Sequence, residues 1–188
     1  MLEKSIKVFD NVLSQDQIDA WKNYYLNTSF RRSPNESGPD GPVYFGRDMF
    51  YQDLIEIFDY ENTIVHYAKQ LDNRITSKVY RSYINIFNEG DKFTGHKDLD
   101  EIPADKYAVS CVLFLNPEWE DSGGGLAFKD DNQHIVVQNQ FNRLIVFHGD
   151  VHHCVQPYKG NKARITLYTQ FNNVIPADLP KVAAQNKW

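Results

Sequence analysis

The chain has 188 residues, of which 41% are hydrophobic and 14% aromatic, a composition typical of a folded globular protein. Twenty Lys and Arg against 25 Asp and Glu give a net charge of −5, the opposite of the balance usual in proteins that bind nucleic-acid backbones. The N-terminal sequence has no apolar signal-peptide core, and no apolar stretch reaches transmembrane length. We therefore expect a cytoplasmic protein without a membrane partner, built as a single domain over residues 1–188.

The chain up to about residue 78 has mainly helical periodicity. Ser14 is a plausible N-cap for a helix over 15–27, and a second apolar face predicts a helix over 53–71. Between them, residues 33–42 (SPNESGPDGP) have the composition of a loop. We expect this loop and the following residues 43–51 to form part of a substrate lid, because long loops often serve binding.

From residue 79 the pattern changes to short runs rich in β-branched and aromatic residues. The predicted strands are 79–87, 107–115, 124–128, 135–137, 144–147, 154–156 and 163–171. Successive short strands without intervening helices predict a mainly β fold, a sandwich or jelly roll over about 79–171, supported by the N-terminal helices. Cys111 and Cys154 fall within these runs and are predicted to be buried free thiols.

The most informative motif is His96-x-Asp98, followed downstream by His153 and Arg164. Residues at i and i+2 of an extended segment project to the same side, so His96 and Asp98 can share one metal. A third ligand from a later strand would complete two imidazoles and one carboxylate, the facial triad of non-haem Fe(II) oxygenases. Arg164 adds a planar fork suited to binding a carboxylate through two parallel hydrogen bonds.

Residues 80–171 resemble the Fe(II)- and 2-oxoglutarate-dependent oxygenases. SCVLFLNPEWEDSGGGLAF (110–128) is similar to the prolyl-hydroxylase branch, and FNRLIVFHGDVHHCVQP (141–157) is similar to the strand that leads into its H-x-V-x-P motif. INIFNEGDKFTGHKDLDE (84–101) instead resembles the AlkB branch, in which N-x-Y precedes HxDxDE. The resemblance implies a double-stranded β-helix, a form of jelly roll, flanked by helices.

Three histidines, His148, His152 and His153, are candidates for the distal ligand. The H-x-V-x-P pattern selects His153, with His152 as the alternative, and neighbours on a strand cannot both face the metal. The resemblance thus implies that His96, Asp98 and His153 form the catalytic metal site. His66 and His134 lie in no motif and are expected to be solvated or half-buried.

The resemblance also implies a co-substrate site. Arg164 matches the family arginine that binds the distal carboxylate of 2-oxoglutarate, and Thr166 faces the same way. Asn85 stands where the AlkB branch has an asparagine that contacts the co-substrate, whereas Phe87 replaces the expected tyrosine. Tyr83, on the same strand face as Asn85, is a candidate to supply the missing phenol, with core packing as its alternative role.

The cofactors implied are Fe(II), 2-oxoglutarate as co-substrate and O2, with ascorbate as a candidate additional reductant. The chemistry implied is hydroxylation of a C–H bond in a peptidyl residue, proline among them, or an amino acid, with release of succinate and CO2. An AlkB-like demethylase of alkylated nucleic acid is the alternative, which the acidic charge and Gln170 in place of a second arginine disfavour. A binding or sensing jelly roll with a vestigial metal site is a third hypothesis. The expected partner is a protein, peptide or small-molecule substrate, and the sequence indicates no oligomeric state.

Overall fold

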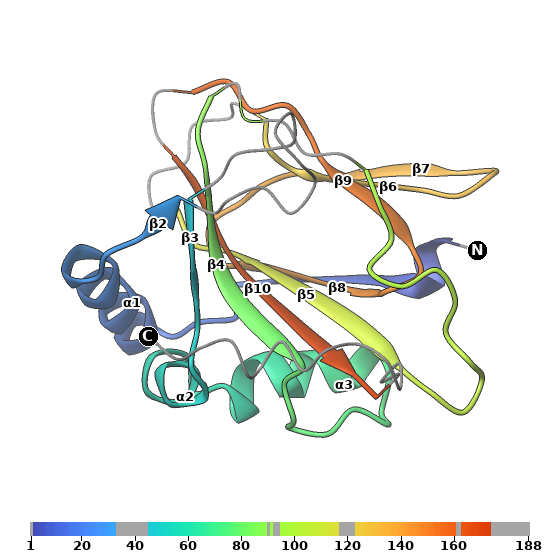
Figure 1. The fold of residues 1–188 in the computed structure, drawn as a ribbon, viewed down its shortest axis with the longest axis horizontal. Helices are drawn as coiled ribbons and strands as arrows, with labels where there is room; N and C mark the ends of the chain where they lie inside the picture. Colours follow the sequence, from blue (N-terminus) through green and yellow to red (C-terminus); the bar gives the residue numbers. More distant parts are fainter. Residues whose placement is uncertain are drawn as a thin grey trace.

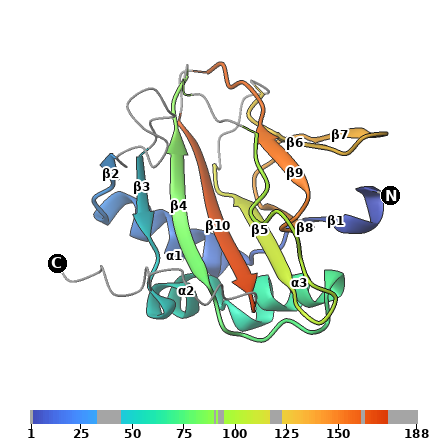
Figure 2. The ribbon, with the colours of Figure 1, turned by 45° about the vertical axis from the view of Figure 1, so that its right-hand side comes forward.

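The computed structural model describes residues 2–32, 45–89, 91, 95–116, 123–160 and 163–173, which form two antiparallel sheets with helices on one outer face (Figure 1). The larger sheet has the strand order β1-β8-β5-β10-β4-β3-β2, and the smaller has the order β7-β6-β9. The predicted helix-flanked jelly roll is confirmed. Turning the molecule shows the smaller sheet standing away from the helices, across the larger sheet (Figure 2).

All seven strands predicted after residue 79 are present, with ends shifted by a few residues. They are β4 (Arg81–Phe87), β5 (Ala108–Phe114), β6 (Leu126–Lys129), β7 (His134–Val137), β8 (Arg143–His148), β9 (His152–Val155) and β10 (Arg164–Asn172). The N-terminal part adds three strands that the sequence reading missed: β1 (Ile6–Asp10), β2 (Arg31–Arg32) and β3 (Phe45–Asp48). These three lie at the two edges of the larger sheet, where short strands show little hydrophobic alternation.

The first predicted helix is confirmed as α1 (Gln15–Asn27), which follows a 3-10 turn at Leu2–Ser5 and strand β1. Ser14 caps it as expected, because its Oγ accepts from the backbone N of Gln17 at 3.4 Å while the Gln17 side chain accepts from Ser14 N at 2.7 Å. Two orphan amide groups at the helix start are thereby satisfied.

The prediction of one continuous helix over 53–71 is wrong. The segment forms α2 (Tyr51–Phe58), a π-helical turn (Glu61–Val65) and α3 (His66–Leu71). Asp59 ends α2 in the left-handed conformation, with φ of 44°, so the chain changes direction there. The apolar residues on both sides of the break still face one core, which is why the sequence pattern looks continuous.

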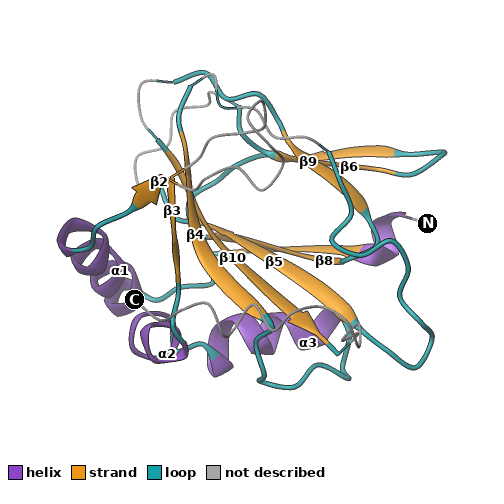
Figure 3. Ribbon diagram, viewed as in Figure 1, coloured by secondary structure: helices purple, strands orange, loops and turns teal. Residues whose placement is uncertain are grey.

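Strand alternation divides the interior into two cores. Val109, Cys111 and Leu113 on β5 point toward the helices, whereas Val112 and Phe114 point between the two sheets. Because both faces of the larger sheet are covered, β5 is buried along its whole length, as expected for a central strand. The helices cover the outer face of the larger sheet (Figure 3), and the second core lies between the two sheets.

Both cysteines are free thiols, as predicted, although only Cys111 is buried and Cys154 is half-buried.

No helix in the described part of the chain is long and apolar enough to cross a membrane. Residues 33–44 of the expected lid lie outside the described residues, while Phe45–Asp48 pair with β4 as part of the larger sheet. The single-domain organisation stays a prediction.

One buried asparagine ties the N-terminal segment to the larger sheet. Asn142 Oδ1 accepts from the backbone N of Leu13 at 2.7 Å, and its Nδ2 donates to Leu13 O at 2.9 Å. The same residue takes the left-handed conformation, with φ of 60°, which asparagine tolerates better than most residues. Its side chain thus replaces a strand partner for the segment that leads into α1.

We predict that Asn142→Ala lowers the free energy of unfolding by about 2–4 kcal/mol, because two buried backbone groups lose their partners and alanine disfavours a positive φ. Chemical denaturation monitored by circular dichroism measures the change. Gln140→Ala, an exposed position in the same turn, is the matched control and should change stability by less than about 0.5 kcal/mol. Equal stabilities for the two variants would contradict the role assigned to Asn142.

Candidate active site

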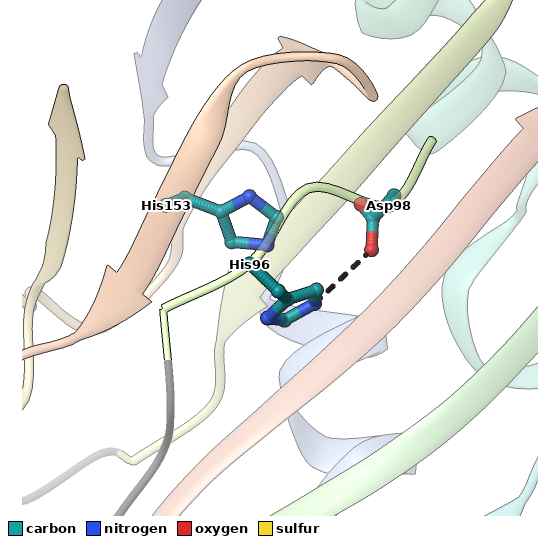
Figure 4. Close-up of side chains that lie close together, drawn as sticks. All are labelled: His96, Asp98 and His153. Carbon is teal, nitrogen blue, oxygen red and sulfur yellow. Dashed lines mark ion pairs between the residues drawn. The ribbon is translucent and has the colours of Figure 1, made fainter. Parts of the chain in front are cut away.

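The structure brings His96, Asp98 and His153 together between the two sheets (Figure 4). One ligand atom from each residue lies within 4.8 Å of the others. His96 and His153 also pair through their backbones, with His96 N donating to His153 O at 3.0 Å and His153 N donating to His96 O at 2.9 Å. The segment that carries His96 and Asp98 is therefore fixed against β9 by the main chain and not by the side chains alone.

The backbone also fixes the ring of His153. Its Nδ1 lies 3.0 Å from Val151 O. A carbonyl oxygen can only accept, so Nδ1 carries the proton and Nε2 keeps its lone pair free for a metal. Burial lowers the pKa of His153 below its usual value, against the opposing effect of the Asp98 charge. The imidazole is thus held neutral, the form that binds metal.

Asp98 presents its two oxygens to different neighbours. Ser110 Oγ donates to Oδ2 at 2.5 Å, while Oδ1 lies 3.4 Å from His96 Nε2 and 3.5 Å from Arg81 Nη2. Burial of the side chain, only 1% exposed, would raise its pKa, but the interactions with His96, His153, Ser110 and Arg81 outweigh burial and lower it to about 2. The carboxylate is therefore ionised at neutral pH, with Oδ1 on the side of the histidines.

The neighbouring histidines stand apart from this cluster. His152 turns to the other face of β9, where its ring packs so closely on Gly95 that a Cβ there would lie 2.6 Å from Cε1. His148 ends β8, and His66 and His134 are exposed. Within the described residues, the cluster that can hold a metal contains His153 and not His152.

Arg164, at the start of β10, is 1% exposed, and its guanidinium has no carboxylate partner within the described part of the chain. Its Nε donates to Gly124 O at 2.6 Å and its Nη1 to Thr166 Oγ1 at 3.4 Å. The guanidinium carbon lies 5.5 Å from the Phe87 ring centroid and 5.2 Å from that of Phe114. Burial lowers the pKa of Arg164 to about 9, because the charged guanidinium loses its contact with water.

The other predicted co-substrate residues line the same inner face. Thr166 is buried beside Arg164, and Asn85 is its partner in register on β4. The buried Oδ1 of Asn85 has no hydrogen-bond partner among the described residues. Tyr83 stacks on Tyr168 with ring centroids 4.8 Å apart, so it lies in the site but beyond Asn85 from Arg164.

Four site residues were not assigned a role from the sequence: Arg81, Ser110, Tyr168 and Gln170. Ser110 Oγ lies 3.1 Å from the Tyr168 hydroxyl, and Arg81 donates to that hydroxyl at 3.4 Å and to Gln170 Oε1 at 2.8 Å. A signal for two of them was available, because Tyr168 and Gln170 share the inward face of β10 with Arg164. The places of Arg81 and Ser110 in the site depend on which strands become neighbours of β10, which the sequence does not show.

A jelly roll that brings two histidines and one aspartate together has the ligand set of the non-haem Fe(II) oxygenases, and the buried Arg164, without a carboxylate partner among the described residues, suits an anionic co-substrate. Residues 79–171 match the family model described as the 2OG-Fe(II) oxygenase superfamily. The chain belongs to this superfamily of 2-oxoglutarate-dependent non-haem iron enzymes. A search of curated protein sequences returned no match.

Solved structures agree on the fold. A Pseudomonas putida prolyl-4-hydroxylase is 18% identical with a TM-score of 0.66, covering 89% of this chain and 92% of its own. The viral collagen prolyl hydroxylase of Paramecium bursaria Chlorella virus-1 is 14% identical with a TM-score of 0.65, covering 91% and 97%. The epimerase SnoN from nogalamycin biosynthesis, solved with Fe3+ and alpha ketoglutarate, is 11% identical with a TM-score of 0.69, covering 97% and 84%. At these identities the likeness concerns the fold.

We predict that His153→Ala weakens Fe(II) binding by at least about 100-fold, since loss of an outer partner of a metal ligand alone costs about 10–100-fold. His152→Ala is the matched control and should keep the affinity of the parent protein. Anaerobic Fe(II) titration measures both. The reverse ranking of the two variants would show that the distal ligand is misassigned.

The pH dependence of Fe(II) affinity follows from the same residues. The pKa of His153 lies below its usual value of about 6.5, and Asp98 is ionised down to about pH 2. Protons therefore compete with the metal at His153 only as the pH falls below about 6.5. We predict constant affinity from pH 7 to 8 and a loss below 6, measured by titration in non-chelating buffers; a loss on raising the pH would contradict this assignment.

Proposed function

We propose that this protein hydroxylates a C–H bond of a peptidyl residue, with proline as the first candidate, or of an amino acid, and releases succinate and CO2. The observation that carries the proposal is that the same fold holds the His96, Asp98 and His153 cluster and an arginine buried without a carboxylate partner among the described residues. The family supplies the oxidative chemistry, which couples decarboxylation of 2-oxoglutarate to attack on a substrate C–H bond.

The residues present fit both implied cofactors. His96, Asp98 and His153 offer the two imidazoles and one carboxylate that suit Fe(II) with positions left open. Arg164 fits the distal carboxylate of 2-oxoglutarate, because a bound carboxylate would neutralise a guanidinium whose neighbours in the described part of the chain are a carbonyl, a hydroxyl and two aromatic rings. Thr166 and Asn85 flank the same position with further polar atoms, and Tyr83 lies one inward-facing position further along β4, stacked on Tyr168.

The protein's own part in the reaction is to orient and to exclude water. Ser110 holds one oxygen of Asp98, so the other is presented toward the histidines. The rings of Phe87 and Phe114 cover Arg164, which keeps the end of the site that holds the co-substrate apolar and strengthens its interaction with a carboxylate. Ascorbate would have no part in these residue roles and would serve only to keep the iron reduced.

The co-substrate role of Arg164 gives a direct prediction. Arg164→Ala should weaken 2-oxoglutarate binding by about 2–5 kcal/mol, the cost of removing one partner of a buried charge pair, and Arg164→Lys should weaken it less. Fe(II) affinity without co-substrate should change little, because Arg164 does not contact the metal cluster. Calorimetric titration of the Mn(II)-loaded protein measures the co-substrate affinity, and an unchanged value in Arg164→Ala would refute the assignment.

The reaction itself is tested by loading the protein anaerobically with Fe(II) and 2-oxoglutarate, admitting O2, and measuring succinate with three substrate pools. We expect proline-containing peptides or free amino acids to raise succinate release and to gain one oxygen atom by mass spectrometry. His153→Ala should abolish both signals. Stimulation by methylated oligonucleotides with release of the alkyl group would instead establish an AlkB-like demethylase, and binding without any turnover would establish a sensing role.

A further inference from the structure

Arg81 brings a second cation to the metal cluster from the side opposite Arg164. Its Nη2 lies 3.5 Å from Oδ1 of Asp98, yet its side chain is 42% exposed, whereas Arg164 is 1% exposed. The guanidinium is therefore in contact with a metal ligand and with solvent at once.

The register of the central strands separates the two arginines. Arg164 pairs with Phe87 at one end of β10, and Gln170 pairs with Arg81 at the other. Six residues of strand at 3.3 Å each span about 20 Å, so the two arginines start from opposite ends of the inner face. Because Asp98 contacts Arg81, the metal cluster lies nearer the Arg81 end of these strands.

The guanidinium of Arg81 is held in place before anything binds. Its Nε donates to Gln170 Oε1 at 2.8 Å, and its Cζ lies 5.3 Å from the Tyr168 ring centroid and 5.9 Å from that of Tyr83. The two tyrosine rings stack on each other 4.8 Å apart, which supports the guanidinium from one side. A planar fork fixed in this way loses little conformational entropy when it binds a carboxylate.

Charge balance indicates what Arg81 binds. In the loaded site proposed above, the charges of Fe(II) and Arg164 are cancelled by those of Asp98 and 2-oxoglutarate. Among the described residues, Asp98 is the carboxylate that lies within ion-pair distance of Arg81. In the loaded site the negative charge of Asp98 would be shared between Arg81 and the metal. One positive charge is left, at the open side of the cluster.

We propose that Arg81 is a substrate-binding residue that recognises a carboxylate of the substrate and so sets which C–H bond faces the metal. The inference rests on the proposed hydroxylase function and narrows its substrates to those with a carboxylate close to the oxidised carbon. Such a carboxylate belongs either to a free α-carboxyl group, as in an amino acid or a peptide terminus, or to an acidic side chain.

The test uses neutral and charged probes of the same shape. Mn(II) replaces Fe(II), 2-oxoglutarate is kept saturating so that Arg164 is occupied, and the paramagnetic relaxation of probe protons reports binding near the metal. N-acetylproline is compared with N-acetylprolinamide, and N-acetylglutamic acid α-amide with N-acetylglutaminamide. We expect the carboxylate member of one pair to bind, and which pair responds distinguishes a free α-carboxyl group from an acidic side chain.

The variants decide whether Arg81 is responsible. Arg81→Gln should lower the apparent affinity for the carboxylate probe by about tenfold and remove its advantage over the amide, while Arg81→Lys should keep part of that advantage. Lys69→Gln, an exposed position on α3, removes the same charge far from the site and should keep the full preference. All comparisons are made at equal bound Mn(II), measured by electron paramagnetic resonance, so that an effect on metal affinity is separated from an effect on binding of the probe.

Equal binding of acid and amide by the parent protein, or a preference that survives in Arg81→Gln, would overturn the proposal. A change only in Mn(II) affinity would assign Arg81 to the support of Asp98 and would also overturn it. The proposed function is judged separately, because relaxation needs no turnover. Hydroxylation without a carboxylate preference contradicts the role of Arg81 alone, and Arg81-dependent binding without turnover of any pool contradicts the hydroxylase function alone.

Discussion

Strand β10 is the element on which both the fold and the site depend. It pairs with β4 on one side and β5 on the other, and its residues alternate between the helix-facing core and the space between the sheets. Ile165, Leu167 and Phe171 face the helices, whereas Arg164 and Tyr168 face the site. A period of two residues thus converts one strand into an apolar support and a row of functional side chains.

The inward row is electrostatically incomplete, and that incompleteness is informative. Buried charges are normally paired, because desolvation of an isolated charge is costly. Asp98 is surrounded by donors, but Arg164 has only neutral partners among the described residues and a pKa lowered to about 9. Burial of Arg164 without a counter-charge therefore lowers the stability of the fold, and a carboxylate that binds to the guanidinium would offset that loss.

The same scaffold carries different substrates in the solved structures it resembles, which include prolyl hydroxylases and an epimerase. A shared jelly roll therefore does not by itself define the substrate. In this chain the discriminating groups are expected where the inner face opens to solvent. Arg81 with its aromatic support is such a group, and its charge favours anionic substrates.

The sequence by itself determined the strands after residue 79, the capped first helix and the shared side of His96 and Asp98, because alternation, capping and the i, i+2 spacing are local properties. Only the tertiary structure decided that Asp59 interrupts the second helix and that N-terminal strands complete the sheet. It also brought His153, which the H-x-V-x-P resemblance selects, next to His96 and Asp98 in space. It also decided the neighbours of Arg81. Those contacts join residues far apart in the chain, and strand register, which local sequence does not specify, sets which of them meet.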